Sequence, residues 1–365
     1  MKTIVSVFPI AKDFHLFKEI GMIPFFFQKE YDFKSYVACY EDEVELPSLN
    51  VLKGLGHLKI NRVTGSETIN LFIFIFRYVR KIDILVLYHL SLRKVLVLIL
   101  AKCLTFGKCK VYLKMDADGR YFNKGFQGYS LYSRLKNVAY NLFDLLSVET
   151  SSLHHFFSTK TKLKVQLIPN GYFPDHSKLN YDEKSNRILT VSRPGDPVKN
   201  VEMLVKSFLK SNPSNWELSI VGQYTDSFRD FLSAELAKTP DARGKIYLLG
   251  PIYDRKELKL LYLQAKVFAL TSISESFGIV LVEALSNGCF LLTSDVLAAN
   301  DVTENQKFGK IFPIGDIDAL SNLLSDLDLG RILLPQPATI SEFAEENFHW
   351  KVIVRKIAAN LNIYD

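Results

Sequence analysis

The segment KVFALTSISESFGIVLVEALSNGCFLLTSD, residues 266–295, contains the pattern that decides the fold. Two apolar runs, KVFALTS (266–272) and CFLLTSD (289–295), have the composition of buried strands. Between them, ESFGIVLVEALSNG (275–288) is apolar on nearly every side and then stops at a glycine, which indicates a buried helix. A strand, a helix and a second strand in this order predict a parallel β-α-β unit.

The same alternation extends along the whole chain. In the first half, β-rich runs occur at 3–8, 35–40, 83–89, 110–116, 145–150 and 164–170, with helical stretches at 91–105, 129–143 and 151–158. In the second half, strands are predicted at 187–193, 216–222, 245–250, 266–272 and 289–295, with helices near 199–210, 226–238, 254–264 and 278–287. This pattern is typical of parallel sheets that carry helices on both faces.

Length and a polar stretch predict two domains. The chain has 365 residues, more than one hydrophobic core usually supports, and SKLNYDEKSN (177–186) separates the two series of strands. We therefore expect two doubly wound α/β domains, residues 1–178 and 179–342, facing across a ligand cleft.

Composition and charge limit the class of protein. With 48% hydrophobic and 23% charged residues, the chain resembles an ordinary soluble globular protein. Its four cysteines form no CxxC pair, which favours a reducing cytosol. The apolar runs at 71–76 and 95–101 are flanked by Arg and Lys, so neither predicts a membrane-spanning helix. Residues 1–175 contain 24 Lys and Arg against 15 Asp and Glu, a net charge of +9, whereas the remainder has 21 against 24.

Several common motifs are absent from the sequence. It has no GxGxxG after the first strand, no GxxxxGK[ST], no HExxH and no GxSxG. KGLGHLK (53–59) has two glycines but lacks the third. No His or Cys spacing suggests a metal site.

Three segments of the second half suggest a site for a diphosphate. VSRPGDPVKN (191–200) places Arg193 at a strand end and Lys199 at a helix start, where two cations suit an anion. SIVGQ (219–223) ends a strand at Gly222, where a backbone can approach a ligand closely. Glu275 precedes a helix whose first N–H groups, at 276–278, favour an anion, and the helix carries Glu283. A nucleotide diphosphate-sugar would use all of these: Arg193 and Lys199 for phosphates, Glu283 for ribose and Glu275 for the sugar.

SESFGIVLVEALSNG (274–288) resembles the E-x7-E signature of retaining family 4 glycosyltransferases of the GT-B fold. VSRPGDPVKN, LSIVGQ and the stretch 247–272 resemble the companion motifs of that family, in the same order, so the likeness covers roughly 187–325. The sequence departs from the family in having one more residue between Arg193 and Lys199 and in having Ser276 where a glycine is common.

The resemblance implies an enzyme that moves a sugar from a UDP- or GDP-type nucleotide diphosphate-sugar to a hydroxyl group, with neither a metal nor another cofactor. It implies a crossover helix at about 343–365 that returns to the first domain. It implies catalytic roles for Glu275, Asp116, Arg193 and Lys199. The donor site that it implies comprises Gly21, Arg193, Lys199, Gly222, Ile252, Glu275, Ser276, Phe277, Gly278, Ile279 and Glu283. The sequence DAD at 116–118 falls in the acceptor half, so we do not predict a metal site there.

Charge and resemblance together predict the acceptor and the location of the protein. Relatives of this family build bacterial capsule, O-antigen and exopolysaccharide on lipid carriers. The basic half contains mixtures of aromatic and basic residues at 76–81 and 119–137, the latter with Lys124, Arg134 and Lys136. Such mixtures suit the anionic inner face of a plasma membrane. We expect a cytoplasmic, peripheral membrane protein with a saccharide or lipid-linked acceptor and no nucleic-acid partner.

Two other functions remain open at this point. A nucleotide-sugar 2-epimerase has the same two-domain architecture and binds the same kind of donor. A non-catalytic protein that binds nucleotide-sugars would also keep every donor-side group.

Overall fold

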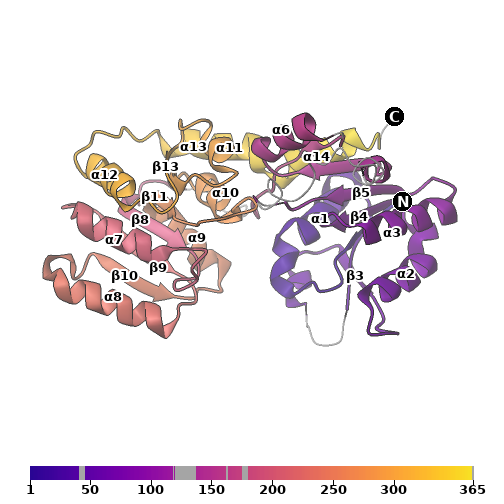
Figure 1. Cartoon of the computed structure of the whole chain (residues 1–365), viewed down its shortest axis with the longest axis horizontal. Helices are drawn as coiled ribbons and strands as arrows, with labels where there is room; N and C mark the ends of the chain where they lie inside the picture. Colours follow the sequence, from indigo (N-terminus) through magenta and orange to yellow (C-terminus); the bar gives the residue numbers. More distant parts are fainter. Residues whose placement is uncertain (41–45, 118, 120–136, 162, 175–179, 364–365) are drawn as a thin grey trace. The chain divides into compact units, whose positions relative to one another are not determined.

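The computed structural model describes residues 1–40, 46–117, 119, 137–161, 163–174 and 180–363 (Figure 1). The chain forms two compact units: Met1–Pro174 with Phe348–Asp365, and Asp175–Asn347. Each unit is an α/β body built on one parallel sheet.

The sheet of the first unit has seven strands in the order β3-β2-β1-β4-β5-β6-β7, and every pairing is parallel. Its strands are β1 (Thr3–Val7), β2 (Lys34–Cys39), β3 (Leu55–Lys59), β4 (Ile84–Tyr88), β5 (Lys110–Lys114), β6 (Leu145–Val148) and β7 (Gln166–Leu167). Its helices are α1 (Glu19–Tyr31), α2 (Glu67–Tyr78), α3 (Leu92–Thr105), α6 (Ser151–Lys160) and α14 (Trp350–Asn360), with short 3-10 turns at Asp13–Phe17, Pro47–Asn50 and Val79–Lys81.

The sheet of the second unit has six strands in the order β10-β9-β8-β11-β12-β13, again all parallel. Its strands are β8 (Ser185–Val191), β9 (Glu217–Val221), β10 (Ile246–Gly250), β11 (Ala265–Leu270), β12 (Phe290–Ser294) and β13 (Gly309–Phe312). Its helices are α7 (Val201–Ser211), α8 (Asp226–Lys238), α9 (Arg255–Gln264), α10 (Ile279–Ser286), α11 (Ala299–Thr303), α12 (Ile317–Asp328) and α13 (Pro337–Phe348), with a 3-10 turn at Pro240–Ala242.

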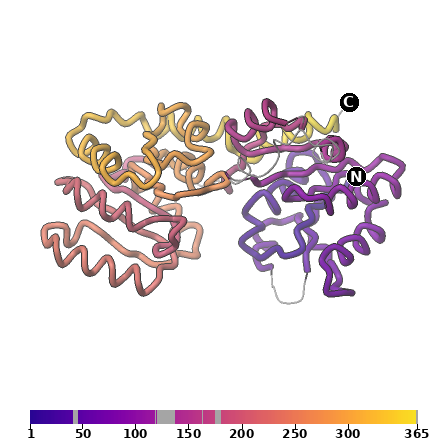
Figure 2. The backbone as a smooth tube through the Cα atoms, in the orientation of Figure 1, coloured from indigo at the N-terminus to yellow at the C-terminus, as the bar shows by residue number. Residues whose placement is uncertain are grey.

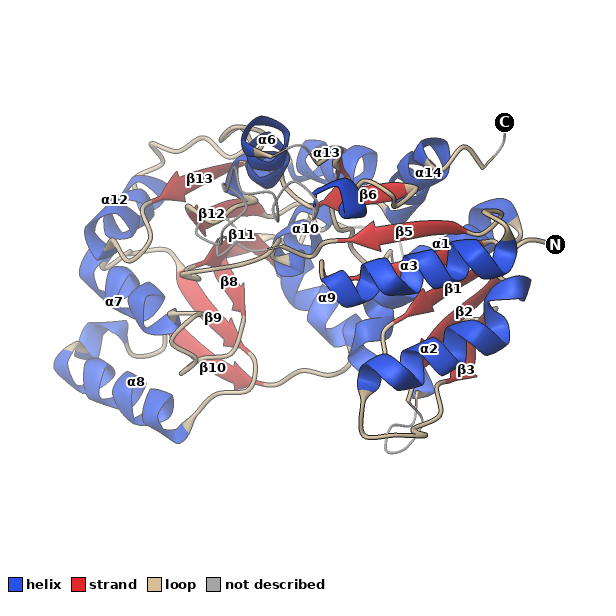
Figure 3. Cartoon of the chain, turned by 45° about the vertical axis from the view of Figure 1, so that its right-hand side comes forward, coloured by secondary structure: helices blue, strands red, loops and turns tan. Residues whose placement is uncertain are grey.

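The predicted α/β class with two doubly wound parallel sheets is confirmed. Central strands such as β4 and β12 are buried along their whole length, because helices cover both faces of each sheet (Figure 3). In each unit the first three strands extend the sheet towards one edge. The later strands then extend it from the first strand towards the opposite edge. The strand order therefore reverses between β1 and β4 and between β8 and β11, and ligands of doubly wound sheets bind beside such switch points.

The last helix of the chain belongs to the first unit. Figure 2 traces the C-terminal backbone back to the N-terminal part of the chain. There α14 packs on α1, and the fully buried side chains of Trp350, Ile353 and Ile357 join the core of that unit. The Lys2 ammonium donates to the Ile363 carbonyl at 3.0 Å, so both ends of the chain are tied to one body. In the described part of the chain, the helices are too short or too polar to cross a membrane.

Candidate functional site

Two loops meet at the switch point of the second sheet, one after β8 and the other after β11. They bring together two residues that the sequence singled out: the Lys199 ammonium lies 2.6 Å from Oε1 of Glu275. The two side chains are only 20% and 13% exposed, so the ion pair is largely shielded from solvent. Partial burial strengthens such a pair compared with one on the surface.

Hydroxyl groups fix both members of this pair. The Ser272 hydroxyl donates to Oε1 of Glu275 at 2.7 Å, and the Ser272 carbonyl accepts from the Ser294 hydroxyl of β12 at 2.6 Å. From the same loop, the Thr271 hydroxyl donates to the carbonyl of Lys199, on the other loop, at 3.1 Å. Sequence reasoning missed Ser272, because its role depends on a contact that no spacing reveals. A lysine ammonium has three N–H donors, so Lys199 can hold Glu275 and also bind an anion.

Arg193 follows β8, as predicted, but no direct contact links it to Lys199 or Glu275. Its guanidinium pairs with Asp196 at 2.7 Å and is 67% exposed. Asp196 also accepts from the Val198 N–H at 3.0 Å, so it holds the whole turn. A guanidinium at this position can reach a second phosphate once it exchanges Asp196 for the ligand.

Gly222 has a structural reason to be glycine. It directly follows β9 with φ 134°, and a side chain here would collide with the carbonyl of Ser192 after β8. Its N–H donates to the Gly250 carbonyl at 2.9 Å. The ends of β8, β9 and β10 are therefore packed backbone against backbone.

The start of α10 presents backbone rather than side chains. Gly278 adopts a left-handed conformation (φ 82°), and no side chain caps the helix. The Phe277 side chain is fully buried, so only its peptide group can face a ligand, while Ser276 and Ile279 are half-buried. Uncapped N–H groups at a helix N-terminus favour an anion.

Glu283 lies one turn further along α10. The hydroxyl of Tyr262, on α9, donates to Oε2 of Glu283 at 3.3 Å. Burial, as the main cause, and the nearby Glu283 carboxylate, as the second, raise the pKa of Tyr262 well above its usual value. The phenol therefore stays protonated. The Glu283 carboxylate is half-buried and has a protein donor, and Tyr262 is a neighbour that sequence reasoning missed.

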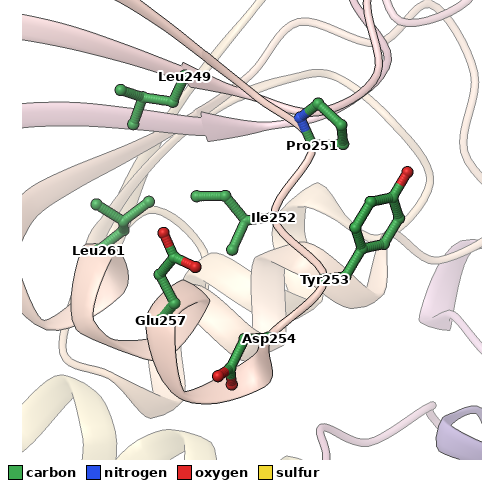
Figure 4. A pocket seen from close by; sticks show the side chains of 7 residues that line it. All are labelled: Leu249, Pro251, Ile252, Tyr253, Asp254, Glu257 and Leu261. Atoms are coloured by element: carbon green, nitrogen blue, oxygen red, sulfur yellow. The ribbon is translucent and has the colours of Figure 1, made fainter.

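A pocket of about 540 Å³ lies beside the start of α9 (Figure 4). Ile252, a predicted donor-site residue, lines it together with Leu249, Pro251, Tyr253, Asp254, Glu257 and Leu261. Asp254 caps α9 by accepting from the Lys256 N–H at 2.8 Å. Leu249, Pro251 and Ile252 line the strand side of the pocket, and Asp254, Glu257 and Leu261 line the side of α9 (Figure 4).

The remaining predicted residues, Gly21 and Asp116, belong to the first unit. Gly21 is buried in the first turn of α1, where any side chain would collide with the Leu16 backbone. Asp116 follows β5 in a left-handed conformation (φ 43°), and its carboxylate lies 3.9 Å from Nδ1 of His89. Asp118, the second carboxylate of the DAD sequence, lies outside the described residues.

Buried charged side chains hold the backbone at Asp116 in place. Glu149 accepts from the N–H groups of Asp116 and Ala117 at 3.0 and 3.2 Å, and it pairs with fully buried Lys114 at 3.2 Å. Nearby, burial and then the Asp116 carboxylate raise the pKa of Glu19 to about 7. Sequence reasoning missed the buried residues Lys114, Glu149 and Glu19. The lysine inside the apolar run KVYLKMD was the one signal of them.

Metal ligands do not gather at either switch point. Within the described ranges, no group of three or more His, Cys, Asp or Glu side chains could hold a metal ion.

Comparison with known proteins identifies the second half of the chain. Residues 173–345 match the family model of glycosyl transferases group 1. A probable sucrose-phosphate synthase of Thermosipho melanesiensis is 29% identical over 160 residues, which are 41% of this chain and 37% of that protein. A phosphatidyl-myo-inositol mannosyltransferase of Mycolicibacterium smegmatis is 27% identical over 200 residues, which are 52% of this chain and 50% of that protein. The chain thus matches half or less of the length of these relatives.

Solved structures resemble the chain over its whole length. Anabaena HepE in complex with UDP has a TM-score of 0.74 at 16% identity, covering 100% of both chains. The lipopolysaccharide outer core galactosyltransferase WaaB has a TM-score of 0.70 at 14% identity, covering 100% of this chain and 99% of its own. At such low identity these likenesses establish the fold alone, and that fold is GT-B. In a chain of this fold, residues 173–345 are thus similar to glycosyl transferases group 1.

Proposed function

We propose that the protein is a retaining glycosyltransferase that moves a sugar from a nucleotide diphosphate-sugar to a hydroxyl acceptor, without a metal ion or another cofactor. The Lys199–Glu275 ion pair beside the start of α10, at the switch point of a glycosyl transferases group 1 domain, carries this proposal.

The chemistry of the pair suits departure of a diphosphate. As the bond between the anomeric carbon and the phosphate oxygen breaks, negative charge grows on the diphosphate. Lys199, Arg193 and the N–H groups at the start of α10 stabilise that charge. Glu275 orients Lys199 and contacts the sugar, while the oxygen of the acceptor hydroxyl forms the new bond and gives its proton to the departing diphosphate. Glu283 accepts from the ribose hydroxyls.

Relatives narrow the choice of donor. HepE structures contain UDP or UDP-glucose, and the structure of the pneumococcal O-GlcNAc transferase GtfA contains UDP and GlcNAc. These names favour UDP over GDP as the nucleotide. The pocket that Ile252 lines, next in the chain to the end of β10, is our candidate for the base.

We further propose that the acceptor is a lipid-linked saccharide of bacterial surface polysaccharide synthesis and that the enzyme acts at an anionic membrane face. The names of WaaB and of the mycobacterial mannosyltransferase support this proposal, as does the net charge of +9 over residues 1–175. Of the aromatic and basic segment 119–137, residues 120–136, which include Lys124, Arg134 and Lys136, lie outside the described residues.

Product analysis tests the function. The protein is incubated with UDP- and GDP-sugars and a bacterial lipid extract, with and without a chelator, and Lys199→Met serves as the matched inactive variant. We expect a glycolipid whose new bond has the anomeric configuration of the donor, formed equally with the chelator. An epimerised nucleotide-sugar formed without an acceptor would instead establish the isomerase. Donor binding with no product from any acceptor would establish the non-catalytic protein.

A further inference from the structure

The outer face of α3 is apolar although it is exposed to solvent. Leu92, Leu96, Ile99 and Phe106 are 44%, 53%, 45% and 92% exposed. They recur at helical spacing, so they form one stripe along the helix and its C-cap. The opposite face of α3 is buried against its own unit. A helix that is apolar on both faces normally has a partner on each side.

Helix α2 extends this stripe into a wider surface. It packs beside α3 on the same face of the sheet, because both helices connect strands in the same direction (Figure 3). The Arg80 guanidinium, just after α2, donates to the Leu104 carbonyl near the end of α3 at 3.5 Å. Ile69 and Phe76 of α2 are 48% and 67% exposed. We call the exposed side of these two helices the α2–α3 face.

Positive charge predominates in the segment that forms the α2–α3 face. Residues 67–110 contain eight Lys and Arg but only two Asp and Glu, a net charge of +6. Lys102 and Lys110 pair with Asp144, so they do not contribute a free field. The exposed cations are Arg77, Arg80, Lys81, Arg93 and Lys108. Apolar side chains are thus presented among five exposed cations, against two exposed carboxylates, Glu67 and Asp83.

This combination selects one kind of partner. A second copy of the chain would bring five cations against five cations, which is repulsive at short range. An anionic lipid bilayer satisfies both features, because phosphates meet the cations while Leu, Ile and Phe enter the boundary of the acyl chains. We infer that the α2–α3 face is the surface by which the protein docks on an anionic bilayer. The inference rests on the membrane association proposed above and assigns it to particular residues.

Vesicle flotation at low salt tests the assignment with matched variants. One variant carries Arg77→Ser, Arg93→Ser and Lys108→Ser. Its control carries Lys34→Ser, Lys53→Ser and Lys160→Ser, which remove the same charge from exposed sites outside α2 and α3. A second variant carries Leu96→Ser and Ile99→Ser. Its control carries Ile10→Ser and Val51→Ser, which are also exposed.

We expect the parent and both controls to float with phosphatidylglycerol vesicles and to stay down with pure phosphatidylcholine. The charge variant should lose about tenfold to a hundredfold in partition coefficient, and the apolar variant at least about tenfold. Equal flotation of these variants and their controls would overturn the assignment. So would a parent protein that stays in the soluble fraction, or one whose mass by light scattering falls from dimer to monomer in the apolar variant.

UDP binding, followed by calorimetry on the same samples, separates this inference from the proposed function. The substituted residues all lie in the first unit, outside the donor site, so UDP affinity should be unchanged. Flotation without sugar transfer would leave the docking surface in place and refute the transferase. Sugar transfer without flotation would support the transferase and refute the docking surface.

Discussion

Substitution of Lys199 and of Glu275 should affect UDP binding in opposite ways. Lys199→Met removes a cation from the proposed phosphate site, and we expect UDP binding to weaken by about 1.5–3 kcal/mol for the charged hydrogen bond lost. Glu275→Gln removes only the competitor of the phosphate for Lys199, so UDP binding should be unchanged or tighter while sugar transfer falls. Calorimetric titration of both variants with UDP checks this. If both bind UDP as the parent does, this loop pair is not the donor site.

Glu19 should make the stability of the first unit depend on pH. Burial, the Asp116 carboxylate and Lys114 together place its pKa at about 7 instead of the usual 4.5. The folded state binds the Glu19 proton more tightly than the unfolded state. The contribution of Glu19 to stability is therefore greatest below pH 4.5 and falls as pH rises to about 7. The shift corresponds to a loss of at most about 3 kcal/mol.

The matched variant for this prediction is Glu19→Gln, which cannot titrate. Between pH 4.5 and 8 the parent should lose stability relative to the variant by up to about 3 kcal/mol. Urea unfolding of both proteins across this range measures the difference. A constant difference at all pH values would show that Glu19 has an ordinary pKa in the folded state.

The ends of β8 and β9 depend on a glycine. At Gly222 a methyl group would meet the Ser192 carbonyl and would force a non-glycine residue to φ 134°. We expect Gly222→Ala to destabilise the second unit by about 2–6 kcal/mol, from strain and collision together. Gly315 also has a positive φ (79°) but has open space around its Cβ position. Gly315→Ala should cost only about 1–2 kcal/mol. If urea unfolding shows the same loss of stability for Gly222→Ala and Gly315→Ala, the ends of β8 and β9 can move apart at little cost.

The central strands could be predicted from the sequence, whereas two edge strands could not. The runs 83–89 and 266–272 correspond to β4 and β11, because strands buried on both faces have continuous apolar sequences. β3 was interpreted only as a glycine-containing stretch, and β13 was not predicted. Both are edge strands that contain glycine and carry weak apolar patterns. Helix α2 was missed because its Ile and Phe residues favour strands as much as helices. The helix predicted at 129–143 falls largely outside the described residues.

The sequence indicated parts of the candidate site but not their support. Lys199 and Glu275 were found because loops after neighbouring parallel strands converge at one edge of a sheet. Ser272 bonds Glu275, Tyr262 bonds Glu283 and Glu149 bonds the Asp116 backbone, and no sequence spacing encodes these contacts. The exposure of the α3 stripe was equally hidden, since an apolar run looks the same whether it is covered or bare.

The two tryptophans of the chain report on different units. Trp350, fully buried at the start of α14, lies in the core of the first unit, and Trp216, 5% exposed just before β9, lies in the second. Trp350→Phe leaves fluorescence that follows the second unit alone, and Trp216→Phe leaves fluorescence that follows the first. Each substitution keeps an aromatic ring in its core. Nε1 of Trp350 has no hydrogen-bond partner that Phe would forfeit.

We expect UDP to stabilise the unfolding transition that Trp216 reports and to leave the transition that Trp350 reports unchanged. The reason is that the nucleotide site proposed here, from Arg193 to Glu283, lies wholly within Asp175–Asn347. At a hundredfold excess over Kd, a ligand that binds only the folded state adds about 2.7 kcal/mol. Urea unfolding followed by tryptophan fluorescence, with and without UDP, measures both midpoints. A shift confined to the Trp350 signal would place the nucleotide in the first unit. Equal shifts of both signals would show that the two units unfold as one cooperative body.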